Sequence, residues 1–517
     1  MAEALRTRRV VVVGAGIGGL VSALLLAHRG LEVTLVEAAA TPGGKIRQVV
    51  VDGVGVDSGP TVFTMRWILD QMLEEIGTSL ESLIRLQPIH VLARHAWRGS
   101  PGALDLFSDT QRSADAIAAF SSPAEARRFL QFCQQTRVLY ATLEKPYIRS
   151  QRPSLLSMGQ DLGPRGLGTL MGLGPFATLW SSLGRHFHDP RLQQLFARYA
   201  TYCGSSPWAA PATLMLVAQV ELDGVWSVDG GMYAVAQALA QLARERGVVQ
   251  HYGKTCSEIE VVQGRVSGVR LASGERLGAD AVVFNGDVGA LSQGFLGLGP
   301  QGAVAPVPVA QRSLSAVTWS MHAEASGFPL VRHNVFFDHD YHSEFDDIFA
   351  KRRLPQQGTV YLCAQDRGDQ GLARPGLERM LALVNAPADG DHRAFQSSEI
   401  HACETRSLAL LRHCGLEVQA QPHQVVRTTP QDFARLFPGT GGALYGRATH
   451  GWMSAFARPS ARSHLPGLYL AGGSAHPGPG VPMAAMSGRL AAATLMADLD
   501  STSRSRRVLI SGGMSTP

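Results

Sequence analysis

The sequence of 517 residues predicts an α/β protein in which a parallel-sheet domain is combined with a mixed α+β domain. Three observations predict this class: a glycine-rich turn between a strand and a helix near the N-terminus, a second glycine-rich turn before a helix near the C-terminus, and β-rich segments between them. A chain of this length is too long to fold around a single hydrophobic core, so two or more domains are expected.

The N-terminal segment contains every part of a βαβ unit. Val10 to Val13 is a run of β-branched residues, which is typical of a strand buried on both faces. A glycine-rich turn and a helical pattern follow, with Leu20 and Leu24 on one side, and a second strand ends at Glu37. Because strand, turn, helix and closing acid occur in this order, the sequence predicts a Rossmann-like dinucleotide-binding domain.

Each part of the turn has a physical role in that prediction. Gly14 permits the tight turn, Gly16 leaves room for a pyrophosphate beside the backbone, and Gly19 lets the helix pack close to the strand. The helix N-terminus presents free N–H groups to the phosphates. The Glu37 carboxylate is expected to accept hydrogen bonds from a ribose 2′-hydroxyl and to disfavour a 2′-phosphate, which argues against NADP.

A second glycine pair distinguishes between the dinucleotides. Gly43, Gly44 and Lys45 come shortly after Glu37, and the segment resembles the extended FAD signature of glutathione-reductase-like and amine-oxidase-like flavoproteins. In those proteins the paired glycines and the basic residue lie along the FAD pyrophosphate and ribityl chain. The resemblance therefore implies FAD as the cofactor.

The middle of the chain alternates between apolar helical patterns and short strands. A turn at Gly59 precedes a helical pattern over 66–77, and the 3.6-residue period predicts a helix over Tyr233–Glu245. Cys256 stands where the resembling flavoproteins have a valine whose backbone contacts the FAD adenine, so it is expected to be a small packing residue and not a redox thiol.

The C-terminal motif, "LPGLYLAGGSAHPGPGVPMAAMSG", is a strand that runs into a glycine- and proline-rich loop. Pro482 stands where a helix is expected to begin, at the favoured first position. With "TPQDF" and "GALYG" upstream, this wording resembles the carotenoid (phytoene-type) desaturase family, and is most similar to its 1-hydroxycarotenoid 3,4-desaturases. The resemblance extends over nearly the whole chain.

The resemblance implies a flavin-dependent desaturase that introduces a C-3,4 double bond into 1-hydroxy or 1-methoxy carotenoids, in spheroidene and spirilloxanthin synthesis. The helix at Pro482 is expected to stabilise negative charge on the flavin. His476 is the one candidate for proton transfer, and the alternative, that it only stabilises the loop, is favoured. The expected cofactor-binding residues are Gly14, Ala15, Gly16, Gly18, Gly19, Glu37, Gly43, Gly44, Lys45, Gly59, Cys256, Gly472, Gly473, Pro482 and Met483.

Two alternatives stay open from the sequence. One is another reaction on the same scaffold, by a phytoene-type desaturase, carotene isomerase, retinoid saturase or amine oxidase. The other is a non-catalytic prenyl-lipid carrier, against which the intact glycines and Glu37 argue.

Composition, charge and residue spacing limit the kinds of partner and ligand that are expected. The net charge of +5 and the scattered arginines argue against nucleic acid, and the cysteine and histidine spacing matches no standard zinc pattern, so no metal is expected. No signal peptide is expected. The uncharged run over 166–184 is interrupted by glycines and Pro175, so it predicts either a monotopic membrane patch or a buried segment.

The expected location is peripheral, on the cytoplasmic face of a bacterial inner membrane, with oxygen or a quinone as electron acceptor. The expected organisation is FAD-binding parts at 1–85, 216–295 and 426–500, substrate-domain parts at 86–215 and 296–425, and a flexible tail at 501–517.

Overall fold

Five parallel strands gather the N-terminal, middle and C-terminal parts of the chain into one sheet. The computed structural model describes residues 8–152, 155–174, 176–369 and 375–511. The strands follow the order β20-β13-β1-β2-β9. Their bounds are β1 Arg9–Val13, β2 Glu32–Val36, β9 Val249–His251, β13 Ala281–Phe284 and β20 Leu468–Leu470.

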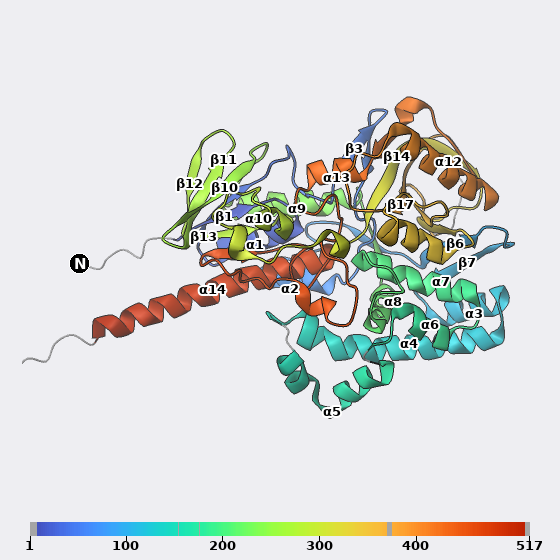
Figure 1. Cartoon of the computed structure of the whole chain (residues 1–517), viewed down its shortest axis with the longest axis horizontal. Helices are drawn as coiled ribbons and strands as arrows, with labels where there is room; N and C mark the ends of the chain where they lie inside the picture. The colour runs from blue at the N-terminus through green and yellow to red at the C-terminus, as the bar shows by residue number, and fades with distance from the viewer. Residues whose placement is uncertain (1–7, 153–154, 175, 370–374, 512–517) are drawn as a thin grey trace, which may run out of the picture.

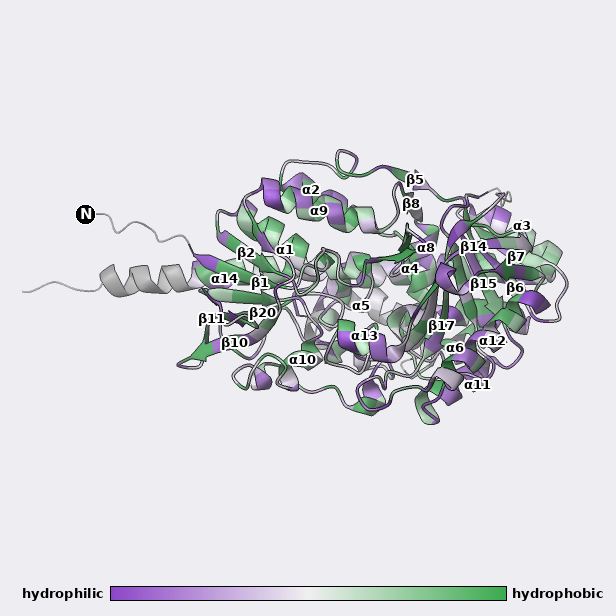
Figure 2. Ribbon diagram, turned by 90° about the horizontal axis from the view of Figure 1, so that it is seen from above, coloured by the Kyte–Doolittle hydropathy of each residue, from purple (hydrophilic) through white to green (hydrophobic). Residues whose placement is uncertain are grey.

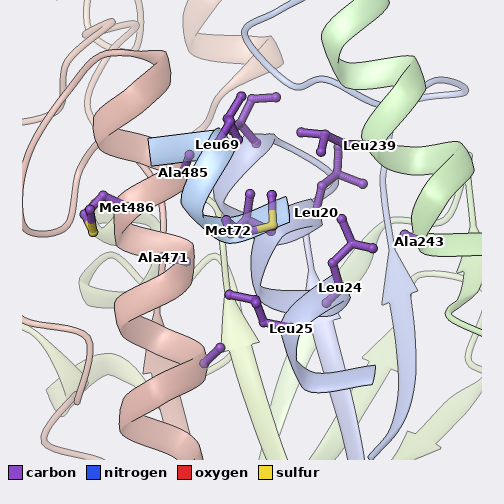
Figure 3. Packing of buried hydrophobic residues seen from close by; sticks show 14 of the residues in the cluster. Leu20, Leu24, Leu25, Leu69, Met72, Leu239, Ala243, Ala471, Ala485 and Met486 are labelled. Carbon is purple, nitrogen blue, oxygen red and sulfur yellow. The ribbon is translucent and has the colours of Figure 1, made fainter. Parts of the chain in front are cut away.

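Helices cover this sheet, and the first and last helices of the chain pack against each other. The N-terminal helix α1 packs against the C-terminal helix α14, with α2 and α9 on its other sides (Figure 3). Leucines of α1 meet Leu69 and Met72 of α2 and Leu239 of α9 in a mainly aliphatic core. The bounds are α1 Ile17–His28, α2 Trp67–Glu75, α9 Tyr233–Glu245 and α14 Val481–Ser511.

A small antiparallel sheet, in the order β10-β11-β12, lies at the same end of the molecule (Figure 1). Its strands are β10 Cys256–Val262, β11 Arg265–Leu271 and β12 Arg276–Gly278, and Val266 and Val269 of β11 are buried. The segment from Val249 to Phe284 thus leaves the parallel sheet by β9 and returns to it by β13.

A mixed sheet forms the opposite end of the molecule (Figure 1). Its order is β18-β14-β17-β16-β15-β6-β7, and β19 also pairs with β14. The bounds are β6 Val91–Trp97, β7 Ala103–Phe107, β14 Ser315–Gly327, β15 His333–Phe337, β16 Val360–Ala364, β17 Glu378–Ala386, β18 Leu416–Gln419 and β19 Val425–Thr428. Helix α12, Ser397–His413, covers part of it.

Shorter pairs and helices complete the connections. The two-stranded pairs are β3 Gln48–Val51 with β4 Val54–Asp57, and β5 Leu86–Pro88 with β8 Trp226–Val228. The remaining α-helices outside the helical layer are α10 Val288–Ser292, α11 Tyr341–Phe345 and α13 Pro430–Leu436.

A layer of helices stands below the mixed sheet in Figure 1, with α5 at its outer edge. It buries a second core rich in phenylalanine, in which the rings of Phe132, Phe187 and Phe196 contact one another. The helices are α3 Thr110–Phe120, α4 Pro123–Leu143, α5 Leu155–Leu173, α6 Leu179–His186, α7 Pro190–Ala197 and α8 Leu216–Leu222, with the 3₁₀ turn Arg198–Cys203 between the last two.

Hydropathy follows these layers. In Figure 2 the strands of the parallel sheet are mostly green and the outer faces of the helices carry purple segments. Among the described residues, none of the helices combines the length and the apolar character that crossing a membrane needs.

Two sequence expectations differ from the structure. The helix α14 begins at Val481, so Pro482 is its second residue and not its first. The helix also continues to Ser511 through the region expected to be a tail, extending beyond the body of the molecule (Figure 1). The rest of that expected tail, residues 512–517, lies outside the described residues.

Candidate functional site

A cavity of about 1050 Å³ lies between the parallel sheet, the mixed sheet and the helical layer. One part is lined by the glycine-rich loops at both ends of the chain, and the other by β14–β17, the Arg198–Cys203 turn and helices α5 and α8. This volume is at the upper end of the roughly 300–1,000 Å³ typical of small-molecule sites. The cavity therefore has room for a large cofactor together with part of a substrate.

The N-terminal loop is held in shape by close backbone packing. Gly14 has a φ of +102°, in a region that favours glycine. A side chain at Gly19 would overlap the Gly14 carbonyl oxygen, and one at Gly16 would lie 2.8 Å from the Asn285 amide nitrogen. The Asn285 side chain in turn donates to the Gly14 carbonyl at 3.3 Å. These glycines thus set the turn and the approach of α1 to β13.

The same packing connects the two ends of the chain. A side chain at Gly18 would lie 2.8 Å from the Gly472 nitrogen and 2.9 Å from the Ala484 oxygen, and one at Gly488 would overlap the Gly18 oxygen. Helix α14 can therefore lie directly on α1 only because these positions are glycine. As a result, the C-terminal loop and the N-terminal loop line one cavity.

The N-terminus of α1 is open toward this cavity. Its N-cap residue, Gly16, has no side chain to cap it, and its first turn contains no acidic residue, while Gly16, Ile17 and Gly18 line the cavity. Backbone N–H groups in such a position bind phosphate. Glu37 accepts hydrogen bonds from the backbone N–H groups of Ala15 at 2.6 Å and Ala39 at 2.8 Å, so its carboxylate both lines the cavity and holds the loop.

The partly buried Lys45 and the buried Arg458 lie in the wall of the same cavity. Lys45 donates to the Leu444 carbonyl at 2.5 Å. Burial lowers the pKa of Lys45; the carboxylate of Asp287 opposes this shift and the charge of Arg458 adds to it. The Arg458 guanidinium donates to three backbone carbonyls, those of Tyr445, Gly473 and Arg447. Arg458 thereby ties the C-terminal loop to the segment before β20.

The structure brings most of the expected cofactor-binding residues together at the cavity. Ala15 and Gly19 are the exceptions; they lie behind the wall, where Ala15 bonds Glu37 and Gly19 packs on Gly14. Those that line the cavity are Gly14, Gly16, Gly18, Glu37, Gly43, Gly44, Lys45, Gly59, Cys256, Gly472, Gly473, Pro482 and Met483. Their contact with FAD itself stays a prediction.

Cys256 has the properties of a packing residue. Burial raises the pKa of its thiol to about 12, and the sulfur lies 3.5 Å from the Glu258 carbonyl. A thiol with so high a pKa is a poor nucleophile at neutral pH.

Sequence reasoning missed Asn285 and Arg458, which line the cavity beside the two loops. Asn285 directly follows a buried strand, and residues at the carboxyl ends of parallel strands meet at the ligand edge of a sheet. The position of Asn285 in the sequence was therefore sufficient to predict it as a site residue. No local pattern marks Arg458, because its three acceptors come from separate turns.

His476 does not line the cavity. It is 2% exposed, its Nε2 lies 2.9 Å from the Ser150 carbonyl, and its ring packs edge-on against Tyr147. This placement favours the loop-stabilising role over proton transfer. Burial also lowers the pKa of His476 to about 4, although carbonyl hydrogen bonds oppose the shift.

The depressed pKa of His476 predicts acid sensitivity. Its ordinary pKa is 6.5, so between pH 6.5 and 4 the unfolded chain binds a proton there that the folded chain does not. The contribution of His476 to the free energy of unfolding is therefore fully present above pH 6.5. It is lost as the pH is lowered through this window, a change on the order of 3 kcal/mol. We expect His476→Gln to flatten the dependence of Tm on pH between 7.5 and 4.5.

The exposed His401 provides the control, because His401→Gln is expected to leave the pH dependence as in the wild type. His450 and His333, whose pKa values burial also lowers, retain part of the slope in every variant. An unchanged slope in His476→Gln would contradict the assignment.

The residues fit the expected FAD. An uncapped helix N-terminus faces the cavity, glycines leave the backbone bare beside it, and Glu37 stands at the end of β2 where a ribose is bound in dinucleotide folds. Lys45 adds a positive charge further along the same wall. No group of three or more potential metal ligands occurs in the part of the chain that the structure describes.

Sequence comparison identifies relatives over the whole chain. The family model for flavin containing amine oxidoreductase matches residues 17–496. The hydroxyneurosporene desaturase of Rubrivivax gelatinosus is 68% identical over 516 residues, covering 100% of this chain and 98% of that protein. The hydroxyneurosporene desaturase of Cereibacter sphaeroides is 45% identical, covering 96% and 99%.

Solved structures share the fold. A putrescine oxidase bound to putrescine aligns with a TM-score of 0.58 at 15% identity, covering 95% of this chain and 99% of that one. Cyclohexylamine oxidase from Brevibacterium oxydans aligns with a TM-score of 0.56 at 15% identity, covering 96% and 100%.

Proposed function

This chain belongs to the flavin-containing amine oxidoreductases, and from that premise we propose that it introduces a C-3,4 double bond into 1-hydroxy or 1-methoxy acyclic carotenoids such as hydroxyneurosporene. We place the reaction in spheroidene and spirilloxanthin synthesis. The observation that carries the proposal is one cavity that joins dinucleotide-binding loops to an apolar chamber, in a chain similar over its full length to hydroxyneurosporene desaturases.

FAD is the cofactor, and when bound it supplies the two-electron oxidant that takes a hydride from the substrate. In this proposal the uncapped end of α1 holds the phosphates, Glu37 the ribose, and Lys45 the middle of the cofactor. The first turn of α14, with Pro482 and Met483 in the wall, presents positive N–H groups to the cavity. These groups stabilise negative charge that develops on the cofactor.

The apolar chamber orients the polyene and excludes water. The cavity is lined by Leu162 and Leu170 of α5 and by Leu381 and Leu383 of β17. Because a polyene has few polar atoms, its position is set by the shape of these walls, and orientation is the main contribution of the protein.

The proposal is tested by pigment analysis. The gene is expressed in cells that accumulate neurosporene, with and without an enzyme that hydroxylates C-1. We expect a product with one more conjugated double bond to accumulate in the hydroxylating cells and to form much more slowly from neurosporene alone. An unchanged pigment spectrum in both strains, with soluble yellow protein present, would contradict the proposal.

We also propose that the mouth of the cavity docks on the cytoplasmic face of a bacterial inner membrane. Met171 and Trp452 line the cavity yet are 71% and 45% exposed, and Phe176, 78% exposed, packs edge-on against Trp452 at 6.1 Å. Met453, 43% exposed, directly follows Trp452 in sequence. An apolar rim at the entrance lets a carotenoid pass from lipid to the chamber without crossing water.

The rim predicts weaker membrane binding in Phe176→Ser/Trp452→Ser. Removing two aromatic side chains is expected to lower partitioning into anionic liposomes by about tenfold or more. The matched control is Leu298→Ser, since Leu298 is 81% exposed but follows α10 on the cofactor-binding side. Equal co-sedimentation of the double variant and the wild type would contradict the docking face.

Oxygen and a membrane quinone are the two electron acceptors that we propose for this site. Turnover without oxygen, with and without a quinone in the liposomes, separates them. Activity restored by quinone alone would assign the quinone.

A further inference from the structure

The walls of the cavity are mostly apolar, but one pair of hydroxyl groups in them can donate a hydrogen bond into the cavity. Thr61 and Tyr361 line the cavity from opposite parts of the chain, and their oxygens lie 2.6 Å apart. The Tyr361 oxygen also lies 2.7 Å from Nδ1 of His333. These three side chains form a chain of hydrogen bonds whose end faces the cavity.

The protonation of His333 can be argued from its surroundings. Burial, with Arg332 and Arg198 nearby, lowers its pKa to about 3, so the ring is neutral and carries one N–H. Its Nε2 is buried and has no hydrogen-bond partner among the described residues. An unpaired buried N–H is rarer than an unpaired acceptor, so the hydrogen belongs on Nδ1, which donates to Tyr361.

Hydrogen counting then leaves one donor unused. Thr61 and Tyr361 each have one hydroxyl hydrogen, and only one of the two can occupy the bond between them. In the part of the chain that the structure describes, the other hydrogen meets only the weakly accepting thiol of Cys363, which burial keeps protonated by raising its pKa. The pair is therefore poised to donate toward the cavity.

A second unpaired hydroxyl lies on the same face of the sheet. Tyr361 is opposite Leu383, and Leu383 is opposite Thr318, so the three residues form one row across β16, β17 and β14. All three line the cavity. The hydroxyl of Thr318, 3% exposed, has no partner among the described residues. This row of the wall thus offers polar contact where the neighbouring wall is apolar.

We propose that the Thr61–Tyr361 hydroxyl pair is a subsite that donates a hydrogen bond to the oxygen on C-1 of the carotenoid substrate. The proposal rests on the proposed function. A donor accounts for both substrate types, because a hydroxyl and a methoxy oxygen both accept a hydrogen bond, whereas only the hydroxyl can donate one.

The location suits the chemistry. The oxygen on C-1 is three bonds from C-3, so its subsite must adjoin the cofactor. Thr61 comes two residues after Gly59, in a loop that lines the cofactor end of the cavity. The rest of the polyene then extends toward α5 and the apolar rim.

Another polar group in the same wall is already satisfied. Tyr202 donates to Oε1 of Glu221 and Tyr199 to Oε2, both at 2.6 Å, while Arg198 donates to the Tyr202 oxygen. Because both tyrosine hydrogens are committed to the carboxylate, this group supports the wall without offering a free hydroxyl. Tyr202 lines the cavity and therefore supplies a matched control.

The test compares two substrates in FAD-loaded protein. We expect Tyr361→Phe/Thr61→Val to lower kcat/KM for hydroxyneurosporene by about tenfold, as for loss of one buried hydrogen bond. The value for neurosporene, which has no oxygen, is expected not to fall. In Tyr202→Phe the ratio of the two values is expected to stay that of the wild type, even if both values decrease.

Each outcome decides the proposal. An unchanged ratio in the folded double variant overturns it, and so does a ratio lost only in Tyr202→Phe. If the double variant does not fold, Tyr361→Phe alone is expected to lower the ratio about threefold, and an unchanged ratio there overturns the subsite. A wild type that desaturates neither carotenoid would instead refute the proposed function.

Discussion

Gly19→Ala is expected to yield protein without FAD and without activity. The added methyl group would overlap the Gly14 carbonyl oxygen and lie 3.0 Å from the Asn285 amide nitrogen, so α1 must move away from the turn. Overpacking of this kind costs about 1–3 kcal/mol or more, and here the displaced backbone is the one that faces the phosphates. The flavin-to-protein absorbance ratio and Tm measure the effect.

The control is a helical glycine with space around it. Among the described residues, no atom beyond its chain neighbours and the backbone of its own helix lies within 4 Å of a methyl group built on Gly168 in α5. Gly168→Ala is expected to keep its FAD and to gain up to about 1 kcal/mol of stability. Normal FAD content in Gly19→Ala would show that the turn is not the phosphate site.

Arg458→Met is expected to have the second large effect. Arg458 is 7% exposed, and its guanidinium satisfies the carbonyls of Tyr445, Gly473 and Arg447, which the thioether cannot do. Each buried carbonyl left unpaired costs about 1–3 kcal/mol, so we expect the C-terminal loop to lose its shape and FAD affinity to fall at least about 100-fold.

An exposed arginine gives the comparison. The side chain of Arg435 is 70% exposed, and its ion pair with Asp432 is expected to contribute little. Arg435→Met should therefore bind FAD like the wild type in a calorimetric titration. Equal FAD affinity in Arg458→Met and the wild type would contradict the role given to Arg458.

Local patterns predicted the parts of the fold that neighbouring residues determine. The turn from Gly14 to Gly19 is set by steric constraints within a few residues, and the helix Tyr233–Glu245 begins and ends at the predicted residues. The fold class follows from such units, and the amine oxidase structures of the same fold confirm it.

The contacts between distant segments could not be predicted in this way. Asn285 bonds the Gly14 carbonyl across 271 positions, and Thr61 meets Tyr361 across 300. Helix α14 lies on α1 because Gly18 and Gly488 are both glycine, which neither motif reveals alone. Burial similarly determines the role of His476, which the sequence placed in a loop near the cofactor but which bonds the Ser150 carbonyl instead.

The most direct test of the desaturase assignment is a single turnover without oxygen. FAD-loaded protein in liposomes is mixed with hydroxyneurosporene, and the flavin and carotenoid spectra are recorded together. We expect loss of the oxidised flavin absorbance with formation of one carotenoid product per flavin, its spectrum shifted by one additional conjugated double bond at C-3,4. Oxidised flavin that persists while the carotenoid is unchanged or only isomerised would contradict it.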